Sequence, residues 1–375
     1  MDLVVLSEVR WSYFRTRKQF LLSRFPDPWR VFFAQPAAFS GDDPWQARTE
    51  GRVTSFAVPF LKPATQQPLY NAATATGAGR ALIEAWAERH LMRRLGELGV
   101  GNSPVAMVSN IYCAGALSRL AAKLIFYDFN DHPLQFAGVP GWAPRYWRAT
   151  LNQVDSLFVV SEHYRRELAG ETSKPLFLLG NGVETAHFSA PRPEPADLAA
   201  VPRPRIGYLG LLSHFLDFDT LEALRRARGS GTVVLIGPES GATRGQLAEF
   251  GRREGVVILG ARPYSQVPAY LQALDVGVIP FRANTRFVRG INPNKVYQYL
   301  AAGLPVVSTP LLDLPAAAPH LQYASSPDEM VAAVRGALAA PHDPGPRRAI
   351  AQAHDWDSIA ARMVEIMNTR LAAVS

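Results

Sequence analysis

The stretch that decides the fold of this chain is Asn292-Pro293-Asn294-Lys295-Val296-Tyr297-Gln298-Tyr299-Leu300-Ala301-Ala302-Gly303-Leu304-Pro305-Val306-Val307. It predicts a loop, a helix, a glycine-proline stop and a buried strand. We expect Asn292 to cap the helix and Pro293 to take its first position. Gly303 fits the end of the helix, and the two valines that follow Pro305 favour a strand.

The start of this predicted helix favours an anion. The first backbone N–H groups of a helix have no partner within it, and the helix dipole places positive charge there. Lys295 lies within the first turn and adds a full charge, and Gln298 follows three residues later on the same face. A phosphate at the helix start with a polar side chain one turn on suits a nucleotide diphosphate.

Length and composition indicate a globular protein of two domains. The chain has 375 residues, of which 48% are hydrophobic and 19% charged, which argues against one ordinary core and against disorder. Its single cysteine, Cys113, excludes an internal disulfide, fits a reducing cytosol and is expected to be a packed side chain. No apolar run approaches the roughly 20 residues of a membrane helix.

The charge of the chain limits its partners. A net charge of +7 suits anionic ligands or an anionic membrane surface, and no nucleic-acid motif is present. Two segments, Arg80–Leu98 and Arg145–Arg148, mix aromatic rings with cations. They are either core rings beside a solvated face, or a surface for a lipid-linked acceptor or a membrane interface.

Short apolar runs alternate with helical ones along the whole chain, which predicts parallel sheets covered by helices. The expected strands are Leu3–Leu6, Arg30–Phe33, Val53–Ala57, Val105–Ser109, Lys123–Tyr127, Leu157–Val160, Leu176–Leu179, Arg205–Leu209, Val233–Ile236, Val256–Leu259, Val276–Ile279 and Val306–Ser308. Prolines between 191 and 204 predict a linker. We expect a first domain over 1–190, a second over 205–355 and a terminal helix over 356–375, with two doubly wound Rossmann-like domains facing each other across a cleft.

The stretch from Asn292 to Val307 resembles the signature of GT-B glycosyltransferases of the retaining clan that includes family four. It is especially similar to bacterial enzymes of surface-polysaccharide assembly, of the teichuronic-acid type. Further resemblance lies in Tyr127–His132, Val154–Glu162 and Asn181–Phe188. It implies a retaining reaction without a metal, with a nucleotide-sugar donor of the UDP or GDP type and no other cofactor. The donor is then expected on the second domain and the acceptor on the first, with the terminal helix returning to the first.

The resemblance also suggests donor residues. Arg282, Asn292 and Lys295 are candidates for the diphosphate, because its departure develops negative charge that needs fixed donors. Gln298 is the candidate for the ribose, although the family usually has Glu there. A neutral amide accepts through one oxygen and donates through nitrogen, so binding is either weaker or adapted. A solvated loop cation and a surface glutamine are the alternatives for Arg282 and Gln298.

Gly260, Arg262 and Tyr264 follow a predicted strand and are candidates for the nucleotide base. The backbone at a glycine allows a close approach, and a tyrosine ring can stack on a base. An ordinary turn fixed by Pro263 explains the same residues equally well.

In the first domain, Asp128, Asp131 and His132 follow a predicted strand and are the catalytic candidates. They would bind sugar hydroxyls, deprotonate the acceptor or support a positively charged transition state. Loop capping and a turn are the alternatives for Asp131 and His132.

The loop after the first strand supplies Arg10, Trp11 and Arg17 as acceptor-side candidates. Asp217-Phe218-Asp219 resembles a metal-binding pattern, but a helix start from Asp219 to Glu222 explains it better. No cluster has zinc or calcium spacing, so no metal site is predicted.

These observations predict a cytoplasmic glycosyltransferase that transfers sugar to a glycan or lipid-linked glycan, with peripheral contact at the inner membrane face. Two other classes stay open. A sugar-nucleotide epimerase can share this two-domain fold. A catalytically weak nucleotide-sugar-binding protein is the other, because of Gln298.

Overall fold

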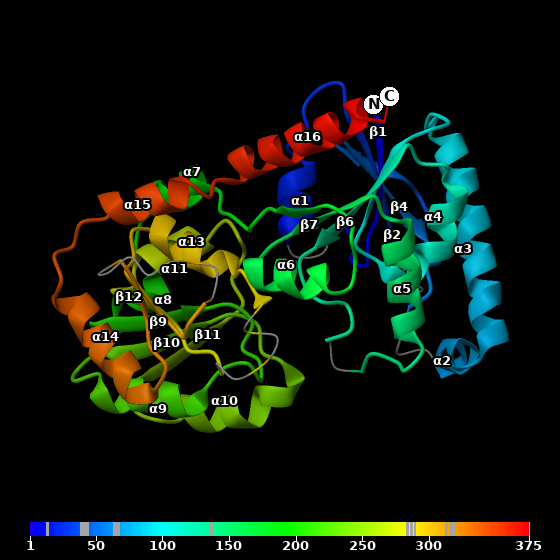
Figure 1. Ribbon diagram of the computed structural model, residues 1–375. Helices are drawn as coiled ribbons and strands as arrows, with labels where there is room; N and C mark the ends of the chain where they lie inside the picture. The colour runs from blue at the N-terminus through cyan, green and yellow to red at the C-terminus, as the bar shows by residue number, and fades with distance from the viewer. Residues whose placement is uncertain are drawn as a thin grey trace. The chain divides into compact units, whose positions relative to one another are not determined.

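The computed structural model describes residues 1–12, 15–37, 45–62, 68–135, 138–282, 285, 288, 290–311, 314 and 320–374. Two compact units make up the chain (Figure 1). Residues 1–179 and 359–375 form unit 1, and residues 180–358 form unit 2. Among the described residues, no helix combines the length and the apolar character needed to span a lipid bilayer.

Unit 1 is built on an eight-stranded sheet. In sheet order its strands are β3 (Arg48–Glu50), β4 (Val53–Val58), β2 (Arg30–Pro36), β1 (Asp2–Leu6), β5 (Val105–Val108), β6 (Leu124–Phe129), β7 (Ser156–Val159) and β8 (Leu176–Leu178). All neighbours pair in parallel except β3, which is antiparallel to β4. The central strand β1 aligns Leu3 with Val31 on one side and with Val105 on the other.

Helices cover this sheet. They are α1 (Arg17–Leu22), α2 (Pro68–Ala75), α3 (Gly77–Glu97), α4 (Ala114–Arg119), α5 (Ala143–Gln153), α6 (Glu162–Ala169) and most of α16 (Trp356–Ala372). The core between sheet and helices holds apolar side chains of β1, β5 and β6 together with Leu91, Tyr146 and Trp147. Central strands that are buried on both faces explain the continuous apolar runs of the sequence.

Unit 2 is built on a six-stranded sheet whose neighbours all pair in parallel. Its order is β11 (Val256–Gly260), β10 (Thr232–Ile236), β9 (Arg205–Leu209), β12 (Val276–Ile279), β13 (Val306–Ser308) and β14 (Leu321–Tyr323). From β9 the chain builds outward to β10 and β11 on one side, and to β12 and its successors on the other. The switch point of this sheet therefore lies between β9 and β12.

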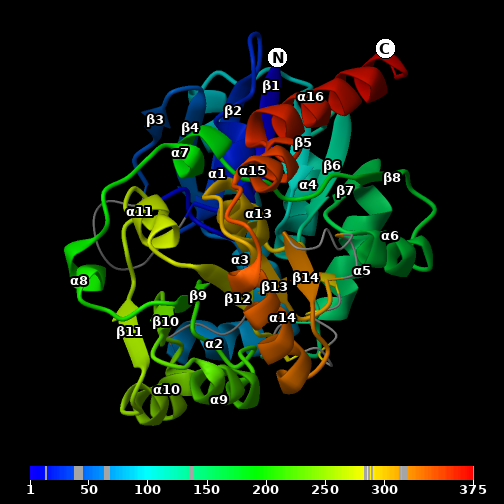
Figure 2. The same ribbon diagram turned by 90° about the vertical axis from the view of Figure 1, so that its left-hand side faces the viewer.

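Two groups of helices cover unit 2. The described helices are α7 (Thr185–Ser189), α8 (Ala196–Ala199), α9 (Phe218–Ala227), α10 (Arg244–Gly251), α11 (Val267–Gln272), α13 (Asn294–Ala301), α14 (Pro327–Ala339) and α15 (Gly345–Gln352). In Figure 2, α9, α10 and α14 lie on one side of the sheet, and α11, α13 and α15 lie on the other. The predicted class, α/β with two Rossmann-like sheets, is confirmed.

The sequence missed two strands, β3 and β14. Each has three residues and lies at a sheet edge. β3 is exposed throughout, so it has none of the apolar character that marks the other strands. The twelve expected strands all correspond to observed ones.

Unit 2 begins at Gly180, ahead of the boundary expected at residue 190. The proline-rich segment 191–204 belongs to unit 2 and contains the short helix α8, whose Leu198 is buried in the core of that unit. Arg205 also binds this segment, since its guanidinium donates to the carbonyls of Val201 and Leu198. Buried donors and an apolar anchor thus make the segment part of a packed unit.

Candidate functional site

The most informative site of unit 2 surrounds the side chain of Lys295. Its ammonium donates to the Tyr208 hydroxyl at 2.7 Å and lies 4.4 Å from the centre of the Tyr208 ring. The Phe281 ring is 4.7 Å away on the β12 side. Tyr208 lies in β9 and Phe281 comes directly after Pro280 at the end of β12. The ammonium therefore lies at the switch point, where α/β sheets bind ligands.

Backbone geometry leaves room for this ammonium. Gly210 follows β9 with φ +141°, and a Cβ there would come within 2.7 Å of Lys295 Nζ. Gly237 follows β10, and a Cβ added at this position would collide with the carbonyl oxygen of Gly210. Only glycine fits such close approaches. The two loops therefore pack tightly at the carboxyl edge of the sheet beside Lys295.

Within the described part of the chain, the Lys295 ammonium has no anionic partner. No carboxylate of the described residues forms an ion pair with it. Burial lowers the pKa of Lys295 to about 7. The cation is thus held between two rings without a counter-ion. An anionic ligand would supply that counter-ion.

This pKa predicts how stability depends on pH. Lys295 has a pKa of about 7 when folded, against 10.5 ordinarily, so the unfolded chain binds its proton more tightly. The contribution of this group to the free energy of unfolding therefore falls as the pH drops from about 10 to about 7, and is constant below that. Lys295→Met should remove this dependence. Urea unfolding of both proteins at pH 6.5, 8 and 9.5 measures it, and parallel pH profiles would contradict it.

The structure corrects the expected start of the helix. α13 begins at Asn294, and Pro293 is the capping position without a side-chain bond. Asn292 instead accepts from the Tyr297 hydroxyl at 3.0 Å, and its carbonyl accepts from the Asn181 amide at 2.8 Å. Because Tyr297 takes its side-chain oxygen, Asn292 does not cap the helix. It fixes the approach to α13, and Lys295 still lies in the first turn.

Gln298 is half-buried, three residues after Lys295 on α13. Its side chain makes no hydrogen bond to another residue of the described part of the chain. It is therefore available to a ligand in contact with Lys295, because residues three apart share a helix face.

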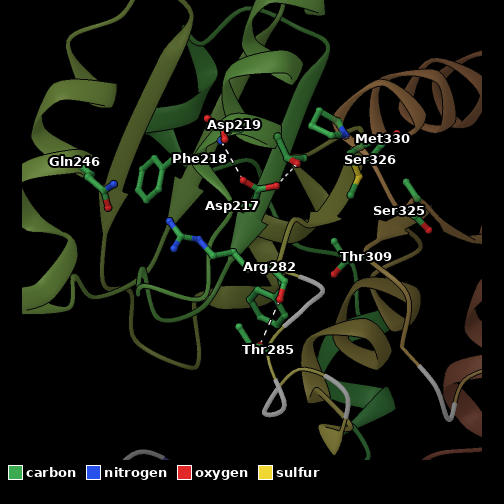
Figure 3. A pocket seen from close by; sticks show the side chains of 14 residues that line it. Asp217, Phe218, Asp219, Gln246, Arg282, Thr285, Thr309, Ser325, Ser326 and Met330 are labelled. Atoms are coloured by element: carbon green, nitrogen blue, oxygen red, sulfur yellow. Dashed lines mark hydrogen bonds between the residues drawn. The ribbon is translucent and has the colours of Figure 1, made fainter. Parts of the chain in front are cut away.

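Arg282 is exposed and lines a polar pocket of about 640 Å³. Figure 3 shows its side chain extending toward Phe218 and Gln246. Phe281 lines the same pocket and also packs under the Lys295 ammonium. The two cationic candidates therefore share Phe281 as a neighbour.

One aspartate of the same pocket, Asp217, caps a helix. Asp217 accepts from the backbone N–H of Asp219 at 3.1 Å and from the Thr220 hydroxyl at 2.6 Å (Figure 3). α9 starts at Phe218, so Asp217 rather than Asp219 is its cap. The cap uses both carboxylate oxygens of Asp217, so the sequence was right to expect a helix start here but placed it at Asp219.

The base candidates after β11 have structural partners. Arg262 forms an ion pair with Asp197 at 2.7 Å and donates to the Tyr270 hydroxyl. Tyr264 stacks on His187 with ring centres 4.9 Å apart. The structure thus places both side chains in the packing of unit 2, whereas Gly260 lies at the strand end with φ +66° and open space at its Cβ position.

Unit 1 has a pocket of about 660 Å³ at the carboxyl ends of its central strands. Arg17, Asp128 and Asp131 line it together. Arg17 Nε and Asp128 Oδ1 lie 2.9 Å apart, and their side chains are 3% and 2% exposed. The structure thus joins candidates that are more than a hundred residues apart in the sequence.

Two charged residues of this pocket escaped the sequence interpretation. Lys18 donates to Glu8 at 2.7 Å, and both line the pocket. Burial opposes the charge of Lys18, but Glu8 and Asp128 outweigh it and raise its pKa. Burial raises the pKa of Asp131, against a hydrogen bond from Asn130. Both could have been predicted from the sequence, because Lys18 is next to Arg17 and Glu8 lies just after β1.

The remaining candidates of unit 1 have other contacts. The Trp11 indole donates to Glu50 at 2.9 Å and meets Phe33 edge to face. The carbonyl of Arg10 accepts from the Gln19 amide. Neither Arg10, Trp11 nor His132 lines the pocket of Arg17 and Asp128.

His132 belongs to a cluster with Glu167 and Glu171, whose ligand atoms all lie within 4.8 Å of one another. The backbone N–H of Leu134 donates to His132 Nδ1 at 3.2 Å. In the neutral ring the proton is then on Nε2, which faces Glu171 Oε1 at 3.4 Å. A nitrogen that donates to a carboxylate offers no lone pair to a metal, so we assign no metal to this cluster.

Comparisons with known proteins bear on the family and the fold of the chain. Residues 203–345 match the family described as "Glycosyl transferases group 1". The Bacillus subtilis protein described as "Putative teichuronic acid biosynthesis glycosyltransferase TuaH" is 27% identical over 168 residues, which are 43% of this chain and 42% of that protein. The chain therefore matches less than half of the length of this relative.

Solved structures match over the whole length. Sucrose-phosphate synthase of Thermosynechococcus elongatus is 15% identical with a TM-score of 0.75, covering 100% of both chains. HepE of Anabaena, solved in complex with UDP-glucose, is 14% identical with a TM-score of 0.65, covering 98% of this chain and 100% of that one. At such identities the likeness establishes the fold, which is that of GT-B glycosyltransferases.

Proposed function

The chain has the GT-B fold and its residues 203–345 belong to the group 1 glycosyltransferases, and on this premise we propose that it transfers a sugar from a nucleoside-diphosphate donor to a hydroxyl of a glycan or lipid-linked glycan. The observation that carries the proposal is the Lys295 ammonium, held between Tyr208 and Phe281 without a carboxylate partner among the described residues. A diphosphate would supply the missing anion.

Unit 2 holds the donor. The Lys295 ammonium and the first N–H groups of α13 bind the diphosphate, and Arg282 adds a second cation. Gln298 contacts the ribose, and the backbone at Gly260 receives the base. Asn292 acts as a positioning residue, since it fixes the chain that leads into α13.

The transfer reaction builds up negative charge on the leaving group. The bond between the anomeric carbon and the phosphate oxygen breaks, the acceptor oxygen bonds to that carbon, and the acceptor proton is released. Negative charge grows on the departing diphosphate, and the fixed positive charge of Lys295 stabilises it at that moment. The sequence resemblance implies that the reaction retains the anomeric configuration.

Unit 1 holds the acceptor. Its pocket combines two cations, Arg17 and Lys18, with the carboxyl groups of Glu8, Asp128 and Asp131. Positive and negative groups in near balance suit an acceptor whose polar groups are hydroxyls. Asp131, whose pKa burial raises, is the candidate to receive the acceptor proton.

Assembly of a bacterial surface polysaccharide is the biological role we assign. The likeness to TuaH, which is described as a teichuronic acid biosynthesis glycosyltransferase, supports it. HepE binds UDP-glucose in its solved complex, which supports a UDP-type donor here. The acceptor would meet the enzyme at the inner membrane face.

The decisive experiment is a thermal-shift screen of nucleoside-diphosphate sugars, followed by product analysis. A true donor at about 100 times its dissociation constant adds roughly 2.7 kcal/mol of stability. With a glycan or lipid-linked acceptor added, the nucleoside diphosphate should be released in step with a longer glycan. Conversion of the donor to a sugar epimer without an acceptor would instead establish the epimerase alternative.

Replacing Gln298 by alanine should weaken binding of the donor by about 1 kcal/mol, the net value of one hydrogen bond. UDP without a sugar should show the same loss, because the contact is with the ribose. Calorimetry with both ligands measures it, and unchanged affinities would remove Gln298 from the site.

Gln298→Glu tests whether this residue marks a weak binding protein. A sharp gain in both donor affinity and turnover would identify the amide as a lesion. A loss in both would identify it as an adaptation of an active enzyme.

A further inference from the structure

One surface of unit 1 exposes large apolar side chains. It consists of α2 and the solvent face of α3, and we call it the α2–α3 face. Leu69 is 88% exposed, Leu82 73%, Trp86 43% and Met92 39%. Figure 1 shows α2 and α3 at the edge of unit 1, with α4 on the inner side of α3. Large exposed apolar side chains gathered on one face mark an interaction surface.

The spacing puts these side chains together. Leu82, Trp86, Arg89 and Arg93 follow one another at intervals of four, three and four residues, so they lie on one stripe of α3. The buried side chains of the helix, among them Ala87, Leu91 and Leu95, lie on the opposite stripe. The exposed stripe therefore belongs to a helix whose other face is already packed.

The charge of the face is positive. Arg89 is exposed and has no ion pair with a described residue, and Arg93 is exposed with its guanidinium 3.8 Å from the carboxylate of Glu97. Between Pro68 and Arg93 the only carboxylates are Glu84 and Glu88, and neither is exposed. Glu88 is bound to Arg119 at 2.6 Å. The face thus offers apolar groups and arginines, and the one exposed carboxylate of α3, Glu97, lies at the end of the stripe beside Arg93 and Arg94.

The two helices are held in a fixed arrangement. Arg80 at the start of α3 donates to the carbonyls of Thr74 and Ala75 at the end of α2, at 2.6 and 3.1 Å. The Arg80 guanidinium also lies 4.9 Å from the centre of the Trp142 ring. The face is therefore already formed before any partner binds.

We propose that the α2–α3 face docks the protein on the surface of a membrane that contains anionic lipid. Leucine, methionine and tryptophan side chains enter the boundary between headgroups and acyl chains, and the arginines bind lipid phosphates. A tryptophan ring suits this boundary because it is apolar with one polar tip. Self-association through the same face would bring Arg89 and Arg93 of two copies together, so a second copy is the poorer partner.

The test is co-sedimentation of the full chain with vesicles of phosphatidylcholine alone, or with about 30% phosphatidylglycerol. The protein should sediment with the anionic vesicles only, and 0.5 M salt should weaken binding by screening. Arg89→Gln/Arg93→Gln should reduce the partition coefficient roughly 20- to 30-fold, because each cation near an anionic membrane surface contributes a known binding free energy. Arg244→Gln/Arg252→Gln, which removes two exposed arginines of unit 2, should leave it unchanged.

The apolar contribution is tested by Leu82→Gln/Trp86→Gln, which should lower the partition coefficient at least tenfold. Donor binding should be the same in the Arg89→Gln/Arg93→Gln and Leu82→Gln/Trp86→Gln variants, because none of these four residues belongs to unit 2. If a variant fails to fold, a dye on Ala78→Cys should shift its emission to the blue with anionic vesicles, whereas a dye on Ala248→Cys should not. The proposal is overturned if the native chain does not bind anionic vesicles, or if the Arg244→Gln/Arg252→Gln control loses as much binding as the Arg89→Gln/Arg93→Gln variant. It is also overturned if the native chain is a dimer that Leu82→Gln/Trp86→Gln dissociates.

Discussion

Lys295→Ala is expected to weaken the binding of a nucleoside diphosphate by about 1.5–3 kcal/mol, the scale of a hydrogen bond to a charged group. This corresponds to a dissociation constant roughly 10- to 150-fold higher. The ammonium lies between two rings at the switch point of the second sheet and has no carboxylate partner in the described ranges. The diphosphate would be its counter-ion, so removing the ammonium removes the cation that pairs with the diphosphate.

Titration calorimetry with UDP and GDP measures this effect. Arg244→Ala removes an exposed cation of the same unit and should leave the affinity unchanged. Lys295→Met should also lose affinity but should not lower the stability of the empty protein, because the buried ammonium has no ion pair to lose. An unchanged dissociation constant for Lys295→Ala would take Lys295 out of the site.

Asp128→Ala is expected to destabilise unit 1 by about 3–5 kcal/mol, because it leaves the Arg17 charge buried without its carboxylate. Their atoms are 2.9 Å apart and both side chains are almost fully covered. For a unit of about 200 residues this lowers the melting temperature by roughly 6–20 °C. Differential scanning calorimetry should show the shift in the transition of unit 1.

Two variants separate this effect from a general response to lost charge. Asp27→Ala breaks the exposed pair with Arg52 and should shift no transition, since solvent screens such pairs. Arg17→Met/Asp128→Leu removes both buried charges and should recover most of the stability that Asp128→Ala loses. A single variant as stable as the native chain would contradict the pairing of Arg17 with Asp128.

The sequence predicted the strands of both units because buried parallel strands are continuous apolar runs. β9 and β12 were located to the residue in this way. The edge strand β3 was missed because a strand exposed throughout has no such run. The capping role of Asn292 was wrong because a tyrosine hydroxyl competes for its side-chain oxygen, and side-chain competition of this kind is invisible in a linear pattern.

The sequence by itself determined which local elements form and that a lysine lies in the first turn of the helix after Pro293. Only the tertiary structure decided the environment of that lysine. The Tyr208 ring reaches it from β9 and the Phe281 ring from the segment just after β12, and these two strands are adjacent in the sheet although the two rings are about seventy residues apart in the chain. In the same way, Arg17 and Asp128 become partners only when β1 and β6 lie in one sheet. Local propensity acts over a few residues, whereas desolvation and charge pairing depend on distances in space, which are set when the whole sheet is assembled.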